Sequence, residues 1–277
     1  MTHKIPATGA APGELVAVPD PSRPHSGRVH DFLLGGKDYY AADSAVGHQL
    51  LGAATQFRTV ARAARRFLLR GVGYTVEQGV RQILELGSGY PCDPNLHELA
   101  QQINPEARTL YIDNDPIVAT HGRALLAEEN TEMVAADITD TGAVLAAVED
   151  FFELTAPITV CFGFVLEFVE DAAGVVRRLA GALPAGSAVV LSHITTDHDG
   201  DIATRAAEVY TAHGIDFYPR SRTEIADLFT GCELADPGLV APQQWWAAEP
   251  PWWTSDAEQR EPRMPRPCCY AAVGWLR

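Results

Sequence analysis

The chain has 277 residues, and 47% of them are hydrophobic, which is enough to bury one large core. Its 36 Asp and Glu residues outnumber its 21 Lys and Arg residues, which gives a formal net charge of −15. A nucleic-acid binder needs a positive face to displace counterions from phosphates, so this balance predicts that RNA and DNA are not partners.

The five cysteines are an odd number and show neither CxxC nor Cys/His ligand spacing. They predict reduced thiols and no metal site. No apolar run approaches the roughly 18 residues that a membrane span needs, and the N-terminus lacks the apolar core of a signal peptide. We therefore expect a cytoplasmic protein with no membrane partner.

The chain begins with a segment, residues 1–24, that is rich in Pro, Ala and Gly and has no hydrophobic period, so it predicts a disordered tail. Helical spacing from Phe57 onward predicts an amphipathic helix that ends near Gly71 to Gly73, with Arg58, Arg62, Arg65 and Arg66 largely on its other faces, in water. We assign residues 25–75 to an N-terminal helical segment and residues 76–277 to the main domain. Within the first lies "HDFLLGGKDYYAAD", residues 30–43, which is either a turn between helices or a lid over a ligand.

Apolar strands then alternate with helices. The expected strands are "RQILELGSG" (81–89), "ARTLYIDNDP" (107–116), "TEMVAADITD" (131–140), "APITVCFGFVLEF" (156–168), "GSAVVLSHITTD" (186–197), "PGLVAPQQW" (237–245) and "CCYAAVGWL" (268–276). This alternation predicts an α/β fold whose mostly parallel sheet is covered on both faces, with ligands at the carboxyl ends of its strands.

The most informative motif is Glu85-Leu86-Gly87-Ser88-Gly89, at the end of the first strand. Glycines there let the backbone approach a ligand that a Cβ would exclude. A dinucleotide site would place a third glycine where Cys92 stands, and would start its helix at once. Here prolines delay the helix until about Asn95, which disfavours a pyrophosphate site. A tight strand-to-helix turn without a ligand is the plain alternative.

S-adenosylmethionine has no phosphate and fits this loop better. It needs backbone contacts for its amino-acid end, a carboxylate for its ribose hydroxyls and a polar contact for its adenine amine. Asp113 ends the second strand and can accept from both ribose hydroxyls. Asp137 ends the third strand and can accept from the adenine amine, with Ile138 offering its backbone and an apolar face.

Four segments carry a family resemblance: "GRVHDFLLGGKDYYAAD", "LELGSGYPCDPNLHELA", "YIDNDPIV" and "VAADITD". From about Arg28 onward the chain resembles the S-adenosyl methyltransferase family, found mainly in actinobacteria and formerly a domain of unknown function. The resemblance implies a Rossmann-like class I methyltransferase fold with an antiparallel last strand, and an N-terminal helical lid over residues 25–75. The predicted contacts to S-adenosylmethionine are Glu85, Gly87, Ser88, Gly89, Asp113, Asn114, Asp137, Ile138, Gly36 and Lys37.

The acceptor is not named by this resemblance. The segment after the fourth strand, "CFGFVLEF", lacks the Asn/Asp-Pro-Pro-aromatic and Pro-Cys patterns of nucleic-acid methyltransferases. We therefore expect a small-molecule acceptor, with a protein side chain as the second choice. If the acceptor must lose a proton, Glu167 and His193 are the candidate bases. The plain alternatives are that His193 is a satisfied polar residue at a strand end and that Glu167 is solvated before a helix. His97 is expected to be a packing residue.

Four tryptophans, Trp245, Trp246, Trp252 and Trp253, lie in or beside a Pro-rich segment. They can wall an acceptor pocket or bury in a homodimer interface, or the segment can simply fold back over the sheet. A different class of function also stays open, namely a non-catalytic sensor or accessory protein that binds S-adenosylmethionine or S-adenosylhomocysteine on an inherited fold.

Overall fold

A computed structural model describes residues 20–126, 128–197, 200–245 and 268–277. The predicted tail, residues 1–24, falls mostly outside this part. In chain order the elements are α1 (Ser26–Leu34), α2 (Ala41–Ala53), α3 (Phe57–Glu77), β1 (Gln82–Leu86), α4 (Leu96–Ile103), β2 (Arg108–Asp113), α5 (Pro116–Leu125), β3 (Thr131–Ala135), α6 (Thr141–Phe151), β4 (Ile158–Gly163), η1 (Leu166–Phe168), α7 (Ala172–Ala180), β5 (Ala188–Ile194), α8 (Gly200–Ala212), α9 (Arg222–Asp227), β6 (Cys232–Leu234), η2 (Pro242–Gln244) and β7 (Cys269–Leu276).

The described strands form one seven-stranded sheet in the order β3-β2-β1-β4-β5-β7-β6. The strands from β1 to β5 pair in parallel, while β7 runs antiparallel to both β5 and β6. This confirms the predicted α/β fold with its antiparallel last strand. The chain order reverses between β1 and β4, so the carboxyl ends of these two strands flank the position where open parallel sheets bind ligands.

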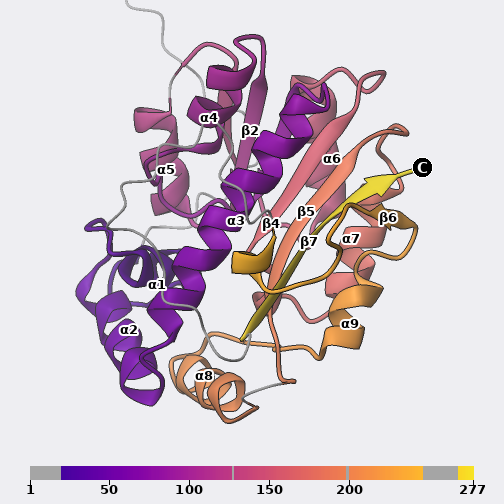
Figure 1. Cartoon of the computed structure of the whole chain (residues 1–277). Coiled ribbons are helices and arrows are strands. Elements are labelled where there is room, and N and C mark those ends of the chain that lie inside the picture. Colours follow the sequence, from indigo (N-terminus) through magenta and orange to yellow (C-terminus); the bar gives the residue numbers. More distant parts are fainter. Residues whose placement is uncertain (1–19, 127, 198–199, 246–267) are drawn as a thin grey trace, which may run out of the picture.

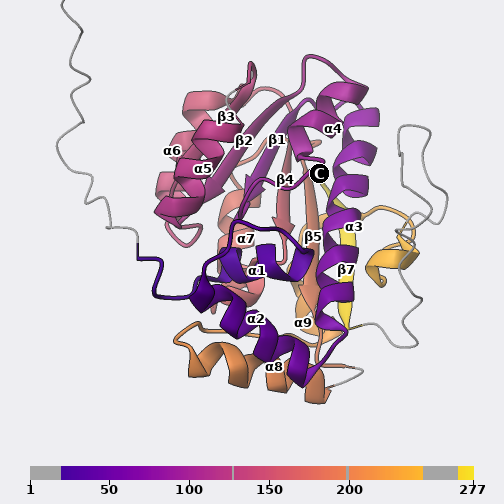
Figure 2. The same ribbon diagram turned by 90° about the vertical axis from the view of Figure 1, so that its left-hand side faces the viewer.

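Helices cover both faces of this sheet (Figure 1). One apolar cluster joins the sheet to α6, α7 and α9, and a second joins it to α3, α4 and α5. A third cluster lies beyond the carboxyl ends of the strands and joins α1 and α2 to the first turns of α3 and to α8. Figure 2 shows α1, α2 and α8 together at this end of the sheet. The segment predicted to be a lid therefore divides, because α3 packs along the sheet and only α1 and α2 lie over its edge.

The predicted end of the long helix near Gly71 to Gly73 is wrong, since α3 continues to Glu77. Its glycines are tolerated because the helix approaches the sheet closely. A Cβ at Gly71 would lie 2.5 Å from Cγ1 of Val190 on β5, and 3.4 Å from Cγ2 of Val273 on β7. Here a glycine marks close packing of a helix on a sheet and not a helix end.

The predicted strand over residues 237–245 is also wrong. The strand that pairs with the end of β7 is β6, Cys232–Leu234, and only Val240 makes a further isolated bridge, to Ala271. Pro242 then opens the short helix η2. A proline cannot donate a backbone hydrogen bond to a neighbouring strand, which limits strand pairing in this segment.

No described helix has the length and apolarity to cross a membrane.

Candidate active site

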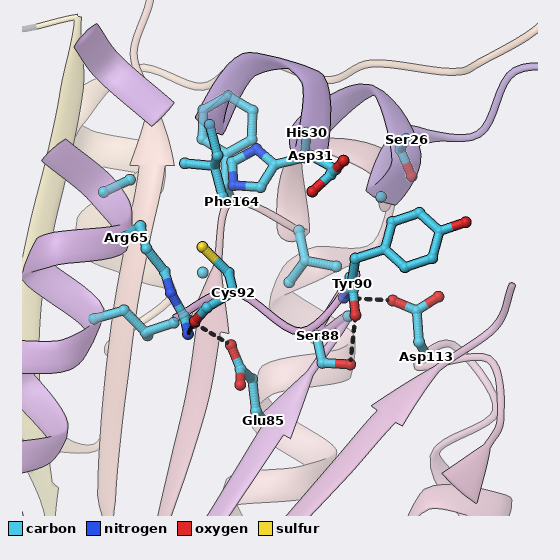
Figure 3. A pocket seen from close by; sticks show the side chains of 18 of the residues that line it. Ser26, His30, Asp31, Arg65, Glu85, Ser88, Tyr90, Cys92, Asp113 and Phe164 are labelled. Atoms are coloured by element: carbon cyan, nitrogen blue, oxygen red, sulfur yellow. Dashed lines mark hydrogen bonds and ion pairs between the residues drawn. The ribbon is translucent and has the colours of Figure 1, made fainter. Parts of the chain in front are cut away.

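A cavity opens at the carboxyl ends of β1, β2 and β4, beneath α1 (Figure 3). It is lined by the start and body of α1, by one side of α3, by the glycine loop after β1 and by the ends of β2 and β4. The residues are His25, Ser26, Gly27, His30, Asp31, Leu34, Ala64, Arg65, Leu68, Glu85, Gly87, Ser88, Gly89, Tyr90, Cys92, Asp113, Asn114, Gly163, Phe164, Val165 and Phe168. Six of the ten predicted cofactor contacts are among them: Glu85, Gly87, Ser88, Gly89, Asp113 and Asn114.

The two glycines of the loop are required for different reasons. Both have left-handed backbones, with φ of 63° at Gly87 and 64° at Gly89. A Cβ at Gly87 would overlap Cγ2 of Val165 and lie 2.9 Å from its Cβ. At Gly89 the nearest neighbour of a Cβ would be the carbonyl oxygen of Gly27, at 3.8 Å. Gly87 is thus needed both for its backbone conformation and for packing against Val165, whereas within the protein Gly89 is needed for its backbone conformation.

Asp113 is buried at the end of β2, and both of its carboxylate oxygens accept backbone hydrogen bonds. Gly89 N donates to Oδ2 at 2.8 Å, and Asp115 N donates to Oδ1 at 2.9 Å. Burial raises the pKa of this carboxyl, while His25, when protonated, and these hydrogen bonds counteract the rise. Because it is fixed by the loop that it faces, Asp113 is preoriented at the cavity wall, where a ribose ligand is expected.

Glu85, at the end of β1, forms a buried ion pair with an arginine that the sequence analysis did not select. Arg65 on α3 donates from Nη1 to Oε1 of Glu85 at 2.9 Å, and from Nη2 to the carbonyl oxygens of Cys92 and Pro94. Burial raises the pKa of Glu85, and Arg65 opposes this shift. The arginine side chain therefore ties α3 to both ends of the glycine loop. Arg65 was assigned in the sequence only to the helical face away from the apolar stripe.

A second buried ion pair seats α1 over the cavity. Nε of Arg28 lies 2.9 Å from Oδ2 of Asp115 and 3.7 Å from Oδ1 of Asp43. All three side chains are at least nine-tenths buried. Asp43 also accepts from the backbone N–H groups of His25 and Tyr40, so it joins the start of α1 to the start of α2. Charges thus hold α1 and α2 to each other and to the loop that follows β2.

The "LLGGKD" motif forms the end of α1 and a tight turn around Asp31. Gly35 caps the helix with φ of 93°, and a Cβ at Gly36 would overlap the Asp31 carboxylate, which also accepts from Asp38 N at 3.0 Å. Asp31 lines the cavity, whereas Gly36 and Lys37 are exposed and do not line it. The glycine pair therefore accommodates an acidic cavity residue, and a cofactor contact from Gly36 or Lys37 stays a prediction.

The predicted adenine contacts lie just beyond the cavity lining. Asp137 accepts from Thr139 N at 2.8 Å and from Asn114 Nδ2 at 3.4 Å. Partial burial would raise its pKa, but these hydrogen bonds outweigh that effect and hold the pKa below its usual value. Ile138 is buried in the core cluster beside α6. The hydrogen bond from Asn114 therefore joins Asp137 to the cavity lining, and the contact of Asp137 with adenine stays a prediction.

The two candidate bases, Glu167 and His193, are fully buried and do not line the cavity. Oε1 of Glu167 accepts from Ile194 N at 2.8 Å. His193 bonds the Ile194 carbonyl through Nδ1 and Nη1 of Arg220 through Nε2, so both of its nitrogens are occupied. Burial lowers the pKa of His193. These residues hold η1, β5 and the Arg220 segment together, a geometry that does not favour their predicted role as bases.

His97 and Trp245 also serve packing. His97 is buried and contacts the Tyr111 hydroxyl through both its backbone N–H and its Nδ1. Trp245 is 1% exposed and packs edge-on against Phe67 and Tyr74 of α3, so it folds back over the sheet and walls no part of the cavity. Trp246, Trp252 and Trp253 lie outside the described residues.

The fold and the cavity define a class of protein: a Rossmann-like α/β protein with a glycine loop after β1, an acid at the end of β2 and Cys92 where a dinucleotide site would have its third glycine. The family model described as S-adenosyl methyltransferase matches residues 15–275. The chain belongs to the S-adenosyl methyltransferase family and is a methyltransferase that uses S-adenosylmethionine.

Solved structures agree with this assignment. A DUF574 family protein from Streptomyces avermitilis is 35% identical, with a TM-score of 0.84 over 93% of this chain and 99% of that chain. A methyltransferase candidate from Thermobifida fusca is 32% identical, with a TM-score of 0.80 over 95% and 97% of the two chains. No curated protein matches the chain.

Proposed function

We propose that this methyltransferase acts on a small-molecule acceptor held between the glycine loop and α1. One observation carries the proposal: the same cavity contains the predicted cofactor contacts and a set of apolar and aromatic side chains above them. The apolar part is lined by Leu34 of α1, Leu68 of α3, and Phe164 and Phe168 beyond β4. Concave sites with apolar walls and few polar groups are typical of small-molecule binding.

The charges of the cavity support S-adenosylmethionine at its floor. Arg65 is paired with Glu85, which leaves the carboxylates of Asp31 and Asp113 as the surplus charge among the described lining residues. The cofactor carries a sulfonium and an ammonium against one carboxylate, so it complements this surplus. A polyphosphate would be repelled. The net charge of −15 supports the exclusion of nucleic acid as the acceptor.

Methyl transfer is an in-line displacement, and the bound cofactor supplies the electrophilic methyl group. The protein has to align the acceptor and keep water away from the sulfonium. The glycine loop and Asp113 fix one side of the site, and α1, held by Arg28, covers it.

We also propose a cytoplasmic location, which the absence of a disulfide among the five cysteines supports.

Calorimetry and a turnover screen test the proposal. S-adenosylmethionine and S-adenosylhomocysteine are expected to bind the purified chain, and Asp113→Ala is expected to weaken both by more than about tenfold, since it removes charge-assisted hydrogen bonds. A panel of small hydroxyl and amine compounds, with RNA, duplex DNA and peptides as controls, is then scored for S-adenosylhomocysteine release. Label transfer into the polymers would contradict the proposal. Binding without release from any small compound would favour the sensor alternative.

A further inference from the structure

His30 is a cavity residue that the sequence analysis did not select as a site residue. It lies on α1, on the opposite side of the cavity from the glycine loop (Figure 3). In the described part of the chain, Nδ1 of His30 is buried without a hydrogen-bond partner, and no hydrogen bond to Nε2 is found. The imidazole nitrogens of His30 can therefore hydrogen-bond a ligand, because no described protein group bonds them in this cavity.

Its position is fixed by an aromatic neighbour. The His30 ring stacks on Phe164, with the ring centroids 5.1 Å apart and an interplanar angle of 27°. Phe164 follows β4 directly and has φ of 59°, which is unusual for a residue other than glycine. Strained residues of this kind cluster at functional sites. Figure 3 shows this pair on the opposite side of the cavity from Asp113, the expected ribose ligand.

The chemistry of the transfer explains why an unused imidazole is useful there. Burial, reinforced by the Arg65 guanidinium, lowers the pKa of His30 to about 4. The ring is therefore neutral at physiological pH and does not repel the sulfonium. A neutral imidazole accepts a hydrogen bond from an acceptor O–H or N–H.

We propose that His30 orients a hydroxyl acceptor toward the methyl group and takes its proton, an inference that rests on the proposed function. A lone pair on the acceptor oxygen forms the new bond to the methyl carbon. The carbon–sulfur bond breaks with its electron pair left on sulfur, which yields the neutral thioether. The acceptor proton moves to His30, and the imidazolium later releases it to water.

The charges favour transfer of the acceptor proton to His30. Methylating a neutral hydroxyl without proton loss would create an oxonium, a far stronger acid than an imidazolium, so even a weakly basic His30 can accept the proton. The positive charge also leaves the sulfur in the same step, so the imidazolium does not face a second cation there. The acceptor class is thus a neutral hydroxyl on an apolar body that fits between Leu68, Phe164 and Phe168.

The position of His30 can be tested without knowing the acceptor. Sinefungin is a cofactor analogue in which a carbon bearing an amine replaces the methylated sulfur, so its amine occupies the place of the methyl group. S-adenosylhomocysteine has nothing at that place. We expect wild type to bind sinefungin more tightly than S-adenosylhomocysteine, and His30→Phe to reduce this preference about tenfold or more while the affinity for S-adenosylhomocysteine stays within about twofold.

Two further variants separate the role of His30 from a structural one. His30→Gln keeps an acceptor oxygen, so it should retain part of the sinefungin preference, but it should lower kcat on a hydroxyl acceptor from the panel by about 10²–10⁴-fold. His48→Gln, an exposed position on α2, should change neither quantity. An unchanged sinefungin preference in His30→Phe overturns the inference. Failure of wild type to bind S-adenosylhomocysteine would instead overturn the proposed function.

Discussion

The glycine loop offers a quantitative test of why each glycine is needed. Gly87 and Gly89 share nearly the same φ, 63° and 64°, but only Gly87 faces a protein side chain, Val165. Alanine at either position incurs the left-handed penalty of about 1–2 kcal/mol. Alanine at Gly87 also overlaps Cγ2 of Val165, and overpacking of this kind costs about 1–3 kcal/mol. We therefore expect Gly87→Ala to destabilise by about 2–5 kcal/mol, and Gly89→Ala by about 1–2 kcal/mol.

Urea unfolding followed by circular dichroism, without ligand, measures both changes. The effect of alanine on the unfolded chain is shared by the two variants and cancels in their difference. Val165→Ala removes the overlapping methyl groups and leaves only its Cβ, at 2.9 Å from the added one, so a small shift relieves the contact. In a double-mutant cycle, Val165→Ala should recover about 1–3 kcal/mol in the Gly87→Ala background and nothing in the Gly89→Ala background.

Two results would refute this reasoning. Equal destabilisation by Gly87→Ala and Gly89→Ala would show that Val165 yields to the added methyl group without cost. Strict additivity of Gly87→Ala and Val165→Ala would show that the two side chains do not compete for the same space.

Three other predictions concern groups around the cavity. Arg28→Met leaves Asp115 and a second buried carboxylate without their cation. It should destabilise the protein by about 3–5 kcal/mol in urea unfolding and speed hydrogen exchange over residues 26–53. Unchanged exchange would show that Arg28 does not hold α1 in place. His30 should titrate near pH 4 by NMR. Because the unfolded chain binds this proton near pH 6.5, the stability contributed by neutral His30 should be fully present above that pH and be lost as the pH falls to about 4. His30→Gln should reduce this pH dependence of the unfolding free energy. A His30 titration near pH 6.5 would contradict the prediction. Glu167→Ala leaves the Ile194 N–H unpaired and should destabilise the protein by about 1–3 kcal/mol with unchanged affinity for S-adenosylhomocysteine. Glu167→Gln should have only a small effect on stability. Lost affinity in Glu167→Gln would indicate a direct role of Glu167 at the site.

The parts of the fold that the sequence predicted well are those with a local signal. Six of the seven predicted strands were found. The start of α5 has a local signal too, because Asp115 and Pro116 occupy its N-cap and its first helical position, which these residue types favour. The misplaced sixth strand and the early end of α3 depended on distant partners. Gly71 is compatible with a helix only because Val190, far along the chain, leaves no room for a Cβ.

The same distinction applies to the site. Gly89 and Asp113 follow strands directly, so the register of a parallel sheet places them at one edge. His30 and Arg65 reach that edge from helices that precede β1, and no periodicity in the sequence says how those helices cross the sheet. Arg65 was read as a solvated charge because it lies off the apolar stripe of its helix. Its partner Glu85 is 20 residues away, and only the fold brings the two together.

The two halves of the cavity have different origins, and one short segment joins them. The sheet edge supplies Asp113 and the glycine loop, while α1 supplies His30. The segment after β2 connects them, because Asp115 N donates to Oδ1 of Asp113 while the Asp115 carboxylate pairs with Arg28 of α1. If Asp113 binds a ribose as predicted, we expect a shift of Asp113 to move the seat of α1, since the peptide that orients one acid carries the other. By the same contact, loosening α1 releases a restraint on Asp113. The predicted ribose contact of Asp113 and the seat of α1 thus share one hydrogen-bonded turn.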